Sequence, residues 1–487
     1  MLRFILVLFM GTCVKSIYTI NVTNQRYRLN YHIMPPAGWS NDPNGLSYFN
    51  GQYHAFFQYC PDNPNGCSTS WGHSISNDLV HWHYAQPTIA ISPNQPYDRD
   101  GCWSGSAVVN DGQLTLIYAG NVQNPFNQTI NIATSTDGVN FTKYSGNPVI
   151  AIPPFDGTTG FKDPKVWRSN GTWYVVISNP TQQPNFPRAV LYKSDDLKQW
   201  TYLGSLAAEV DDSENLGSMW DDPNFFYLNG KFILLTSAEG VLRDGNRFAN
   251  LFQVGYFIGD FDYQTNFFNR SDFYELDLGY DFFAAQVFED PKGRMILMAW
   301  MYTMGSPLPE QADGWAGALT LPRQLILSED GTRVKMVPIE ELKSLRGNQY
   351  VNSPIFINGQ FDPKIPCDST EVIMNISLLQ APGKRIGMRF GYMQLYYDRQ
   401  YKKLVLARNK DIRQVDLGNI TQVNLRVFFD KSSVEVFAND GAATMTSRFY
   451  SDPAPGLILF AESSNEMPGT ANVNLQAFHL NSIYGNN

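Results

Sequence analysis

Short β-prone runs that follow Asn-Gly or Asp-Gly pairs recur along the first two thirds of this chain. Four such pairs begin at Asn50, Asp111, Asn170 and Asn229, and they stand about 60 residues apart. These pairs favour the two-residue turns of β-hairpins, because both turn residues adopt positive φ angles there. A repeat of about 60 residues is typical of one four-stranded propeller blade, so a section of about 310 residues predicts five blades.

The chain after Pro338 predicts a second kind of β fold. A short segment over Glu340–Leu345 follows the proline and has the pattern of a short helix. About 130 residues with alternating β pattern come next, for example Val423 to Phe429, and they suit a β-sandwich. We therefore predict an all-β chain with a five-bladed β-propeller over 25–338, a linker helix over 339–348 and a β-sandwich domain over 349–487.

The N-terminus has the pattern of a secretory signal peptide. An apolar run from Phe4 to Val14 follows Arg3, and small residues suit cleavage after Ser16. The run is too short to span a bilayer. We therefore predict a signal peptide over 1–16, a secreted, extracellular protein and no membrane partner. Seven Asn-x-Ser/Thr sequons support export, at Asn21, Asn127, Asn140, Asn170, Asn269, Asn375 and Asn419.

Charge and cysteine content narrow the classes of function. The formal charge of −9, with no basic run, argues against a nucleic-acid partner. Aromatic residues make up 14% of the chain, which suits sugar binding and equally suits a β-rich core. Cys60 and Cys67 bracket a Pro/Asn/Gly loop, so a local disulfide is expected in an oxidising compartment, although sequence does not fix the pairing. No metal-ligand spacing occurs, and we predict no metal and no cofactor.

The stretch Gly38–Gly45 combines a tryptophan, a carboxylate and a dense turn pattern. It reads Gly-Trp-Ser-Asn-Asp-Pro-Asn-Gly and contains Asp42. Functional carboxylates often lie on loops that a rigid scaffold positions. Asn-Asp-Pro-Asn-Gly is equally a good turn by itself, so the rest of the chain has to decide between the two interpretations.

This stretch and nine further motifs, in a fixed order, decide it. They are Trp39–Gly45, Phe57–Tyr59, Trp71–His73, Gly101–Ser106, Phe161–Trp167, Met219–Pro223, Asp281–Gln286, Leu321–Arg323, Glu341–Leu342 and Asp430–Phe437. Through them the chain resembles glycoside hydrolase family 32, the invertases and related β-fructofuranosidases, from about Tyr31 to Tyr450. The resemblance implies a five-bladed propeller followed by a β-sandwich, with a funnel-shaped site at the propeller axis. It also implies hydrolysis of terminal fructose from sucrose, a small sugar substrate, with net retention.

The same resemblance assigns roles to individual residues. It makes Asp42 the nucleophile, Asp163 the transition-state stabiliser and Asp221 the acid/base, the set that retaining hydrolysis of a glycoside needs. His73 is expected to be structural. The predicted substrate-binding residues are Asn41, Gln58, Trp39, Trp71, Trp103, Ser104, Lys162, Asp222 and Asp281, with the tryptophans as an apolar wall and Gln286 as a further candidate.

Two positions depart from the pattern of the family. Asp221 stands where the family has the Glu of Glu-Cys-Pro, and its carboxyl group is therefore about 1.5 Å shorter in reach. Lys162 replaces the Arg of Arg-Asp-Pro, which keeps the charge and loses the planar fork. A misplacement of about 1 Å can cost about a hundredfold in rate. Asp222, next to Asp221, adds a carboxylate that would not titrate independently.

Three alternatives to a sucrose hydrolase stay open on the sequence. The same fold could transfer fructosyl units to sugar acceptors, or cleave longer fructans. The departures at Lys162 and Asp221 also suit a sugar-binding protein with an intact pocket and no catalysis. Neither the oligomeric state nor the preferred chain length of the substrate follows from the sequence.

Overall fold

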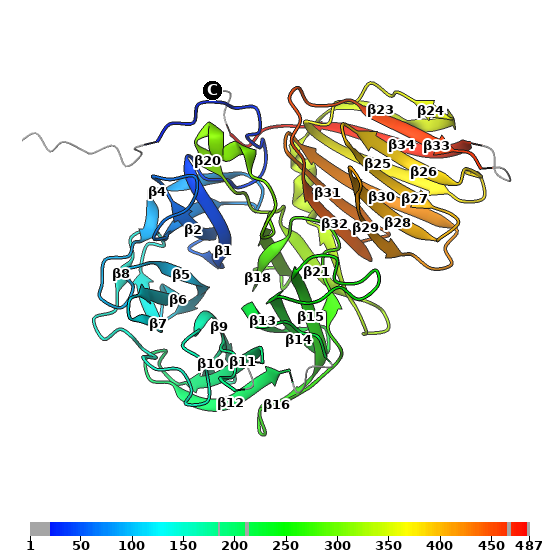
Figure 1. Ribbon diagram of the computed structural model, residues 1–487. Coiled ribbons are helices and arrows are strands. Elements are labelled where there is room, and N and C mark those ends of the chain that lie inside the picture. The colour runs from blue at the N-terminus through cyan, green and yellow to red at the C-terminus, as the bar shows by residue number, and fades with distance from the viewer. Residues whose placement is uncertain (1–19, 184–185, 210–213, 465–468, 485–487) are drawn as a thin grey trace, which may run out of the picture.

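The computed structural model describes residues 20–183, 186–209, 214–464 and 469–484. The predicted signal peptide over 1–16 lies outside these residues. Five β-sheets surround a common axis, and two six-stranded sheets form a second body beside them (Figure 1). This is the predicted all-β architecture of a five-bladed propeller followed by a sandwich. In the described part of the chain, no helix is long and apolar enough to cross a membrane.

Each propeller sheet runs from an innermost strand at the axis to an outer edge. The first blade contains β1 (Gly38–Phe49), β2 (Gln52–Cys60), β3 (Ser70–Ser76), β4 (Trp82–Ile91) and β20 (Trp315–Ala316). The second contains β5 (Cys102–Asn110), β6 (Gln113–Gln123), β7 (Phe126–Ser135) and β8 (Thr142–Lys143). The third contains β9 (Lys162–Ser169), β10 (Thr172–Ser178), β11 (Arg188–Ser194) and β12 (Thr201–Ala208).

The last two blades complete the ring. The fourth contains β13 (Met219–Leu228), β14 (Lys231–Glu239), β15 (Phe252–Asp262), β16 (Phe267–Arg270) and β17 (Tyr274–Glu275). The fifth contains β18 (Phe283–Glu289), β19 (Met295–Trp300), β21 (Arg323–Leu327) and β22 (Val334–Pro338), and the 3₁₀ helix η1 (Pro309–Asp313) lies between β19 and β20. The ring closes where β20, late in the chain, pairs in parallel with the start of β1.

The four Asn/Asp-Gly pairs are the turns between the first and second strands of blades one to four. Asn50 and Gly51, for example, have φ angles of 49° and 83°, and the equivalent pairs at Asp111, Asn170 and Asn229 also have positive φ angles. The fifth blade has no such pair, because a longer turn that includes Gly293 joins β18 to β19. The turn pairs therefore mark four blades, and the length of the section relative to the repeat predicted the fifth.

The sandwich stacks two antiparallel sheets over one apolar core. One sheet contains β23 (Arg346–Asn358), β34 (Thr470–Leu480), β25 (Ser369–Ser377), β30 (Gln422–Asp430), β31 (Ser433–Ala438) and β32 (Ala443–Arg448). The other contains β24 (Gln360–Phe361), β33 (Leu457–Glu462), β26 (Arg385–Phe390), β27 (Met393–Asp398), β28 (Lys403–Arg408) and β29 (Asp411–Asp416). The 3₁₀ helix η2 (Glu340–Leu345) precedes β23, in the segment where a linker helix over 339–348 is predicted.

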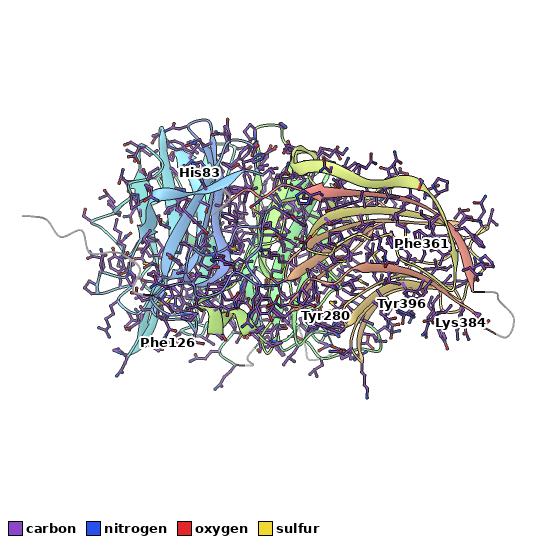
Figure 2. The ribbon with its side chains drawn as sticks, turned by 90° about the horizontal axis from the view of Figure 1, so that it is seen from above. His83, Phe126, Tyr280, Phe361, Lys384 and Tyr396 are labelled. Carbon is purple, nitrogen blue, oxygen red and sulfur yellow. A yellow bond between two sulfur atoms is a disulfide. The ribbon has the colours of Figure 1, made fainter. Side chains whose placement is uncertain are left out.

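Buried polar groups join the two bodies. Tyr280, labelled at their junction in Figure 2, donates its hydroxyl to the main-chain oxygen of Asp411 at 2.7 Å. Arg323 of the propeller contacts Glu435 of the sandwich at 2.6 Å and is also bound to Asp277. Removal of one partner from a buried ion pair leaves an uncompensated charge and is strongly destabilising. These contacts therefore fix the orientation of the two bodies.

A β-bulge interrupts the innermost strand of every blade at an equivalent place. The register shifts occur at Asn41–Asp42, Trp103–Ser104, Asp163–Pro164, Asp222–Pro223 and Ala284–Ala285. A bulge places two residues opposite one and changes the direction of their side chains. The strands run side by side around the axis, so the five bulges bring side chains from all blades to one end of it.

Side chains just beyond the bulges tie neighbouring blades together. The amide of Gly105 donates to Asn44 Oδ1, and the amide of Val287 donates to Asn224 Oδ1, each at 3.1 Å. The amide of Val166 donates to Ser106 Oγ, also at 3.1 Å. These bonds satisfy buried backbone groups and fix the innermost strands relative to one another.

Candidate active site

Asp42 lies on the bulge of β1 and accepts two hydrogen bonds from neighbouring side chains. Ser104 Oγ donates to its Oδ2 at 2.7 Å, and Asn41 Nδ2 donates to its Oδ1 at 3.2 Å. Burial raises the pKa of the Asp42 carboxyl, whereas these two hydrogen bonds lower it. The two donors therefore stabilise the ionised form, which is the form a nucleophile needs.

Gln58 extends this network from β2. Its Nε2 donates to Ser104 Oγ at 3.2 Å, and the side chain is only 3% exposed. Among the described residues, its Oε1 has no hydrogen-bond partner. A buried amide oxygen without a donor is costly unless a ligand hydroxyl supplies one. This orphaned oxygen, two hydrogen bonds from Asp42, suits recognition of a sugar hydroxyl.

Asp163 begins the third blade in a conformation that few residues adopt. Its φ angle is 59°, and its Oδ2 accepts the main-chain amide of Asp222 at 3.2 Å. Burial raises its pKa to about 7; Lys162 opposes the rise, and the charges of Asp221 and Asp42 add to it. The mutual effect of their charges places Asp163 in one electrostatic cluster with Asp42 and Asp221. The positive φ angle of Asp163 is a strained conformation of the kind found at functional sites.

Lys162 forms the principal ion pair of this cluster. Its Nζ lies 2.6 Å from Asp221 Oδ1 and 3.9 Å from Asp163 Oδ2, and 5.8 Å from the centre of the Trp103 ring. Within the described residues, Asp221 Oδ1 has no hydrogen bond of good geometry, so its contact with Lys162 is mainly electrostatic. Burial lowers the pKa of Lys162, but Asp221 and Asp163 outweigh it and raise the pKa above its ordinary value. Lys162 therefore stays charged and neutralises Asp221.

Asp222 lies against the fifth blade. Gln286 Nε2 donates to its Oδ1 at 3.0 Å, and only 2% of Asp222 is exposed. Burial, followed by the charges of Asp163 and Asp42, raises its pKa well above the ordinary value. Asp222 is therefore the neutral member of the adjacent pair, as expected for two carboxyl groups in one closed site.

The structure adds a carboxyl group that sequence reasoning missed, Glu239 at the end of β14. It pairs with Met219 across the strands, while Ser237 pairs with Asp221, so Glu239 lies diagonally across from Asp221. Burial and the nearby charge of Asp221 raise the pKa of the Glu239 carboxyl to about 8. Reflecting the sequence about the Asn229-Gly230 turn would have brought Glu239 close to the start of β13, and this was the available signal.

The three predicted wall tryptophans differ in their surroundings. Trp39 and Trp103 are partly exposed, and Trp39 Nε1 donates to Asn41 Oδ1 at 2.9 Å. Trp71 is fully buried and donates its Nε1 to the main-chain oxygen of Trp103 at 3.1 Å. The expectation that Trp71 lines the funnel is therefore corrected. Its indole packs between the first and second blades, against Phe56 and Tyr118, and supports the main chain at Trp103 instead.

Asp281 lies in the junction between the two bodies rather than in the carboxylate cluster. It is fully buried and accepts bonds from Arg408 Nη1 at 2.7 Å and from the Arg448 amide at 2.8 Å. Its other partners are Ser306 and Ser447. The prediction of a substrate contact failed here because two arginines of the sandwich, distant in sequence, take up this carboxylate.

Three other sequence features fall outside the site. His73 is fully buried and bonded to His54, as expected for a structural histidine. The predicted disulfide between Cys60 and Cys67 is present. Within the described residues, no group of three or more His, Cys, Asp or Glu side chains is arranged to hold a metal ion.

A cavity of about 610 Å³ occupies the opposite end of the innermost strands, away from the carboxylates. It is lined by the later residues of those strands, among them Leu46, Val166 and Phe226. Lys165 lies beside it and donates to the main-chain oxygen of Val287, and burial lowers its pKa to about 7. Because the carboxylates lie at the strand starts, this cavity is separate from the candidate active site.

Comparison with known proteins shows which family models and which relatives this chain matches. The model of the glycosyl hydrolases family 32 N-terminal domain matches residues 32–338, and the family 32 C-terminal model matches residues 341–479. A raffinose invertase of Escherichia coli is 38% identical over 86% of this chain and 89% of its own length. A sucrose-6-phosphate hydrolase of Escherichia coli is 38% identical over 87% of this chain and 89% of its own.

A solved structure has the same arrangement. The family 32 β-fructofuranosidase of Bombyx mori superposes with a TM-score of 0.84, covers 95% of each chain and is 34% identical. A mutant of that enzyme was solved in complex with sucrose. The similarity therefore extends over both the propeller and the sandwich.

Proposed function

The chain belongs to the glycosyl hydrolases of family 32, and we propose that it is a secreted β-fructofuranosidase that hydrolyses sucrose with retention. One observation carries the proposal: Asp42, Asp163 and Asp221 lie in the first halves of three innermost strands and act on one another through their charges. The invertase relative and the sucrose complex of the Bombyx mori enzyme support sucrose as the substrate.

In this mechanism, Asp42 attacks the anomeric carbon of the fructosyl unit as a carboxylate. Ser104 and Asn41 hold its two oxygens, and their hydrogen bonds oppose the effect of burial on its charge. The bond to the glucosyl oxygen breaks as that oxygen takes a proton from the carboxyl cluster around Asp221. Water then attacks the same carbon, the bond to Asp42 breaks, and a proton of the water returns to the cluster. Because both steps invert the carbon, the overall configuration is retained.

Asp163 stabilises the transition state in this proposal. Its backbone is fixed by the bulge of β9, and the Asp222 amide holds one of its oxygens. Hydrogen bonds from fructosyl hydroxyls to Asp163 strengthen as the ring flattens and gains positive charge, which is differential binding of the transition state. Its pKa of about 7 in the free protein falls once a cationic ring lies beside it.

The charge balance favours an uncharged sugar over a phosphorylated one. The cluster contains the carboxyl groups of Asp42, Asp163, Asp221, Asp222 and Glu239, against the single ammonium of Lys162. A phosphate group would add two negative charges near a site that already disfavours ionisation. We therefore propose sucrose, rather than the sucrose 6-phosphate of several relatives, as the preferred substrate.

Secretion is part of the proposal. The apolar N-terminus and the Cys60–Cys67 disulfide support an oxidising compartment. Six of the seven sequon asparagines are exposed, and Asn375 is half-buried. Expression in a eukaryotic secretory cell, N-terminal sequencing of the released protein and glycosidase treatment test it. Retention of the protein inside the cells, or an intact N-terminus, would contradict it.

The decisive experiment is glucose release from sucrose by the purified protein. Asp42→Asn is expected to abolish turnover, whereas Asp260→Asn, an exposed aspartate of the fourth blade, leaves it unchanged. Proton NMR of the first-formed fructose, or transfer to methanol, reports the configuration. Absence of turnover on sucrose, sucrose 6-phosphate and short fructans, with fructose still bound, would replace the enzyme with the sugar-binding alternative.

A further inference from the structure

The ion pair between Lys162 and Asp221 conflicts with the role that the family pattern gives to Asp221. A general acid has to hold a proton before the reaction starts. The Lys162 ammonium instead occupies Asp221 Oδ1 at 2.6 Å, and Asp221 is only 6% exposed. Its side chain is also one methylene shorter than the glutamate of the family pattern. Both features make Asp221 a poor proton donor.

Glu239 lies beside this carboxylate and has the properties that Asp221 lacks. It reaches the start of β13 from the end of the neighbouring strand β14, and it is half-buried. The strand register places Glu239 diagonally across from Asp221, whose Oδ1 is occupied by Lys162 Nζ at 2.6 Å, so Glu239 is the neighbouring carboxyl group without this ammonium contact. The residues opposite Glu239 on β13 and β15 are Met219 and Phe252, which do not titrate.

The geometry points to Glu239 as the proton donor of the hydrolysis, with the Lys162–Asp221 ion pair beside it on the neighbouring strand. This inference rests on the proposed function. As the fructosyl carbon bonds to Asp42, the electron pair of the breaking bond goes to the leaving oxygen, which takes the proton of Glu239. In the second half, water attacks the same carbon, its proton returns to the Glu239 carboxylate, and the bond to Asp42 breaks. One carboxyl proton is lost and one regained in each cycle.

The charges around Glu239 agree with this role. Burial and then the charge of Asp221 raise the pKa of Glu239 to about 8, whereas Lys162 lowers it. Asp163 adds a smaller rise. Glu239 is therefore protonated at neutral pH. Removal of the Asp221 charge would lower its pKa, and this separates the two residues experimentally.

The test compares Glu239→Gln and Asp221→Asn on two substrates over a pH series. Glutamine keeps the shape and can still donate to Asp221, but it supplies no proton. For Glu239→Gln we expect kcat/KM on sucrose to fall by at least about a hundredfold, with loss of the alkaline limb of the pH profile. On p-nitrophenyl β-D-fructofuranoside, whose leaving group needs little protonation, we expect a loss of about tenfold or less.

Asp221→Asn gives the opposite signature if Glu239 is the donor. Its alkaline limb moves to lower pH, and its losses on the two substrates are similar, because the donor remains. Glu275→Gln is the matched control: Glu275 is a carboxyl group of the same blade whose pKa is also raised by burial, and it binds the Phe248 amide. This control should leave both rates and the pH profile unchanged.

Three results would overturn the inference. The first is an unchanged alkaline limb with kcat/KM on sucrose within about threefold of the wild type in Glu239→Gln. The second is a selective loss on sucrose in Asp221→Asn, which would make Asp221 the donor. In both cases the wild type is active, and the proposed function stands. The third is a wild type that hydrolyses neither substrate, which would overturn the proposed function as well.

Discussion

His32 offers a quantitative test of how the propeller and the sandwich are held together. Its Nδ1 lies 2.8 Å from Asp430 and its Nε2 lies 2.8 Å from Glu435, and the side chain is almost fully buried. Burial would lower its pKa, but the two carboxylates outweigh burial and raise it from 6.5 to about 9. The imidazole therefore bridges a segment ahead of the first blade to two strands of the sandwich as a cation.

The magnitude follows from the two pKa values. A difference of about 2.5 corresponds to about 3 kcal/mol, because one pKa unit is worth about 1.4 kcal/mol. The folded pKa lies above the unfolded one, so this stability is complete below pH 6.5 and is lost as pH rises through about 9. Tyr31 beside it does not titrate in this window, because burial and the charges of Asp430 and Glu435 raise its pKa well above 10.

The perturbation is His32→Gln, with urea unfolding measured from pH 6 to pH 10. We expect the loss of unfolding free energy in the variant to shrink by about 3 kcal/mol over this range. All ten tryptophans precede residue 339, so tryptophan fluorescence reports the propeller, and far-ultraviolet circular dichroism reports both bodies.

His54→Gln is the control, because burial lowers the pKa of His54 and its contribution changes only below pH 6.5. A difference between the wild type and His32→Gln that stays constant over the whole range would refute the reasoning. It would mean that His32 is neutral in the folded protein.

Three further predictions concern the site. Glu239→Gln should gain stability relative to the wild type as pH rises from 4.5 to 8, because the raised pKa of Glu239 penalises folding there; equal pH dependence in urea unfolding would contradict this. Adding Asp221→Glu to Glu239→Gln should restore sucrose turnover by about tenfold or more, because it returns a longer acid to β13; a double variant as slow as the single one would argue against this exchange. Gly38→Ala should lower the free energy of unfolding by about 1–3 kcal/mol and lower kcat, because φ is 76° and a Cβ would lie 2.1 Å from the Cys60 main-chain oxygen. Thermal melting measures the loss, and an unchanged melting temperature would show that β1 tolerates the substitution.

The fold was more predictable than the site because its signals are local. Each Asn/Asp-Gly pair determines a turn through the φ angles of two adjacent residues, as at Asn50 and Gly51. Ring closure by β20 against β1 joins residues far apart in the sequence, and no local pattern indicated it. The disulfide between Cys60 and Cys67 was accessible to prediction because the two cysteines are only seven positions apart in the sequence.

Some of the predicted site residues lie in the carboxylate network, and others are held by packing partners elsewhere in the fold. Asp42, Ser104 and Gln58 form one network, although they come from three strands. Trp71 and Asp281 belong to equally distinctive motifs, yet Trp71 is buried and donates to the main chain of Trp103, and Asp281 binds arginines of the sandwich. A motif identifies a residue as constrained, but it does not tell whether the constraint comes from a ligand or from a packing partner.

The sequence by itself determined the family, the β character of both bodies and the identity of the carboxylates, because these are properties of residues and of short-range pattern. Only the tertiary structure decided which charges face one another. Lys162 forms an ion pair with Asp221, Gln286 binds Asp222, and Glu239 lies diagonally across the strand pair from Asp221. The protonation of a carboxyl group depends on burial and on charges within a few ångströms, and in this protein those charges come from three different blades.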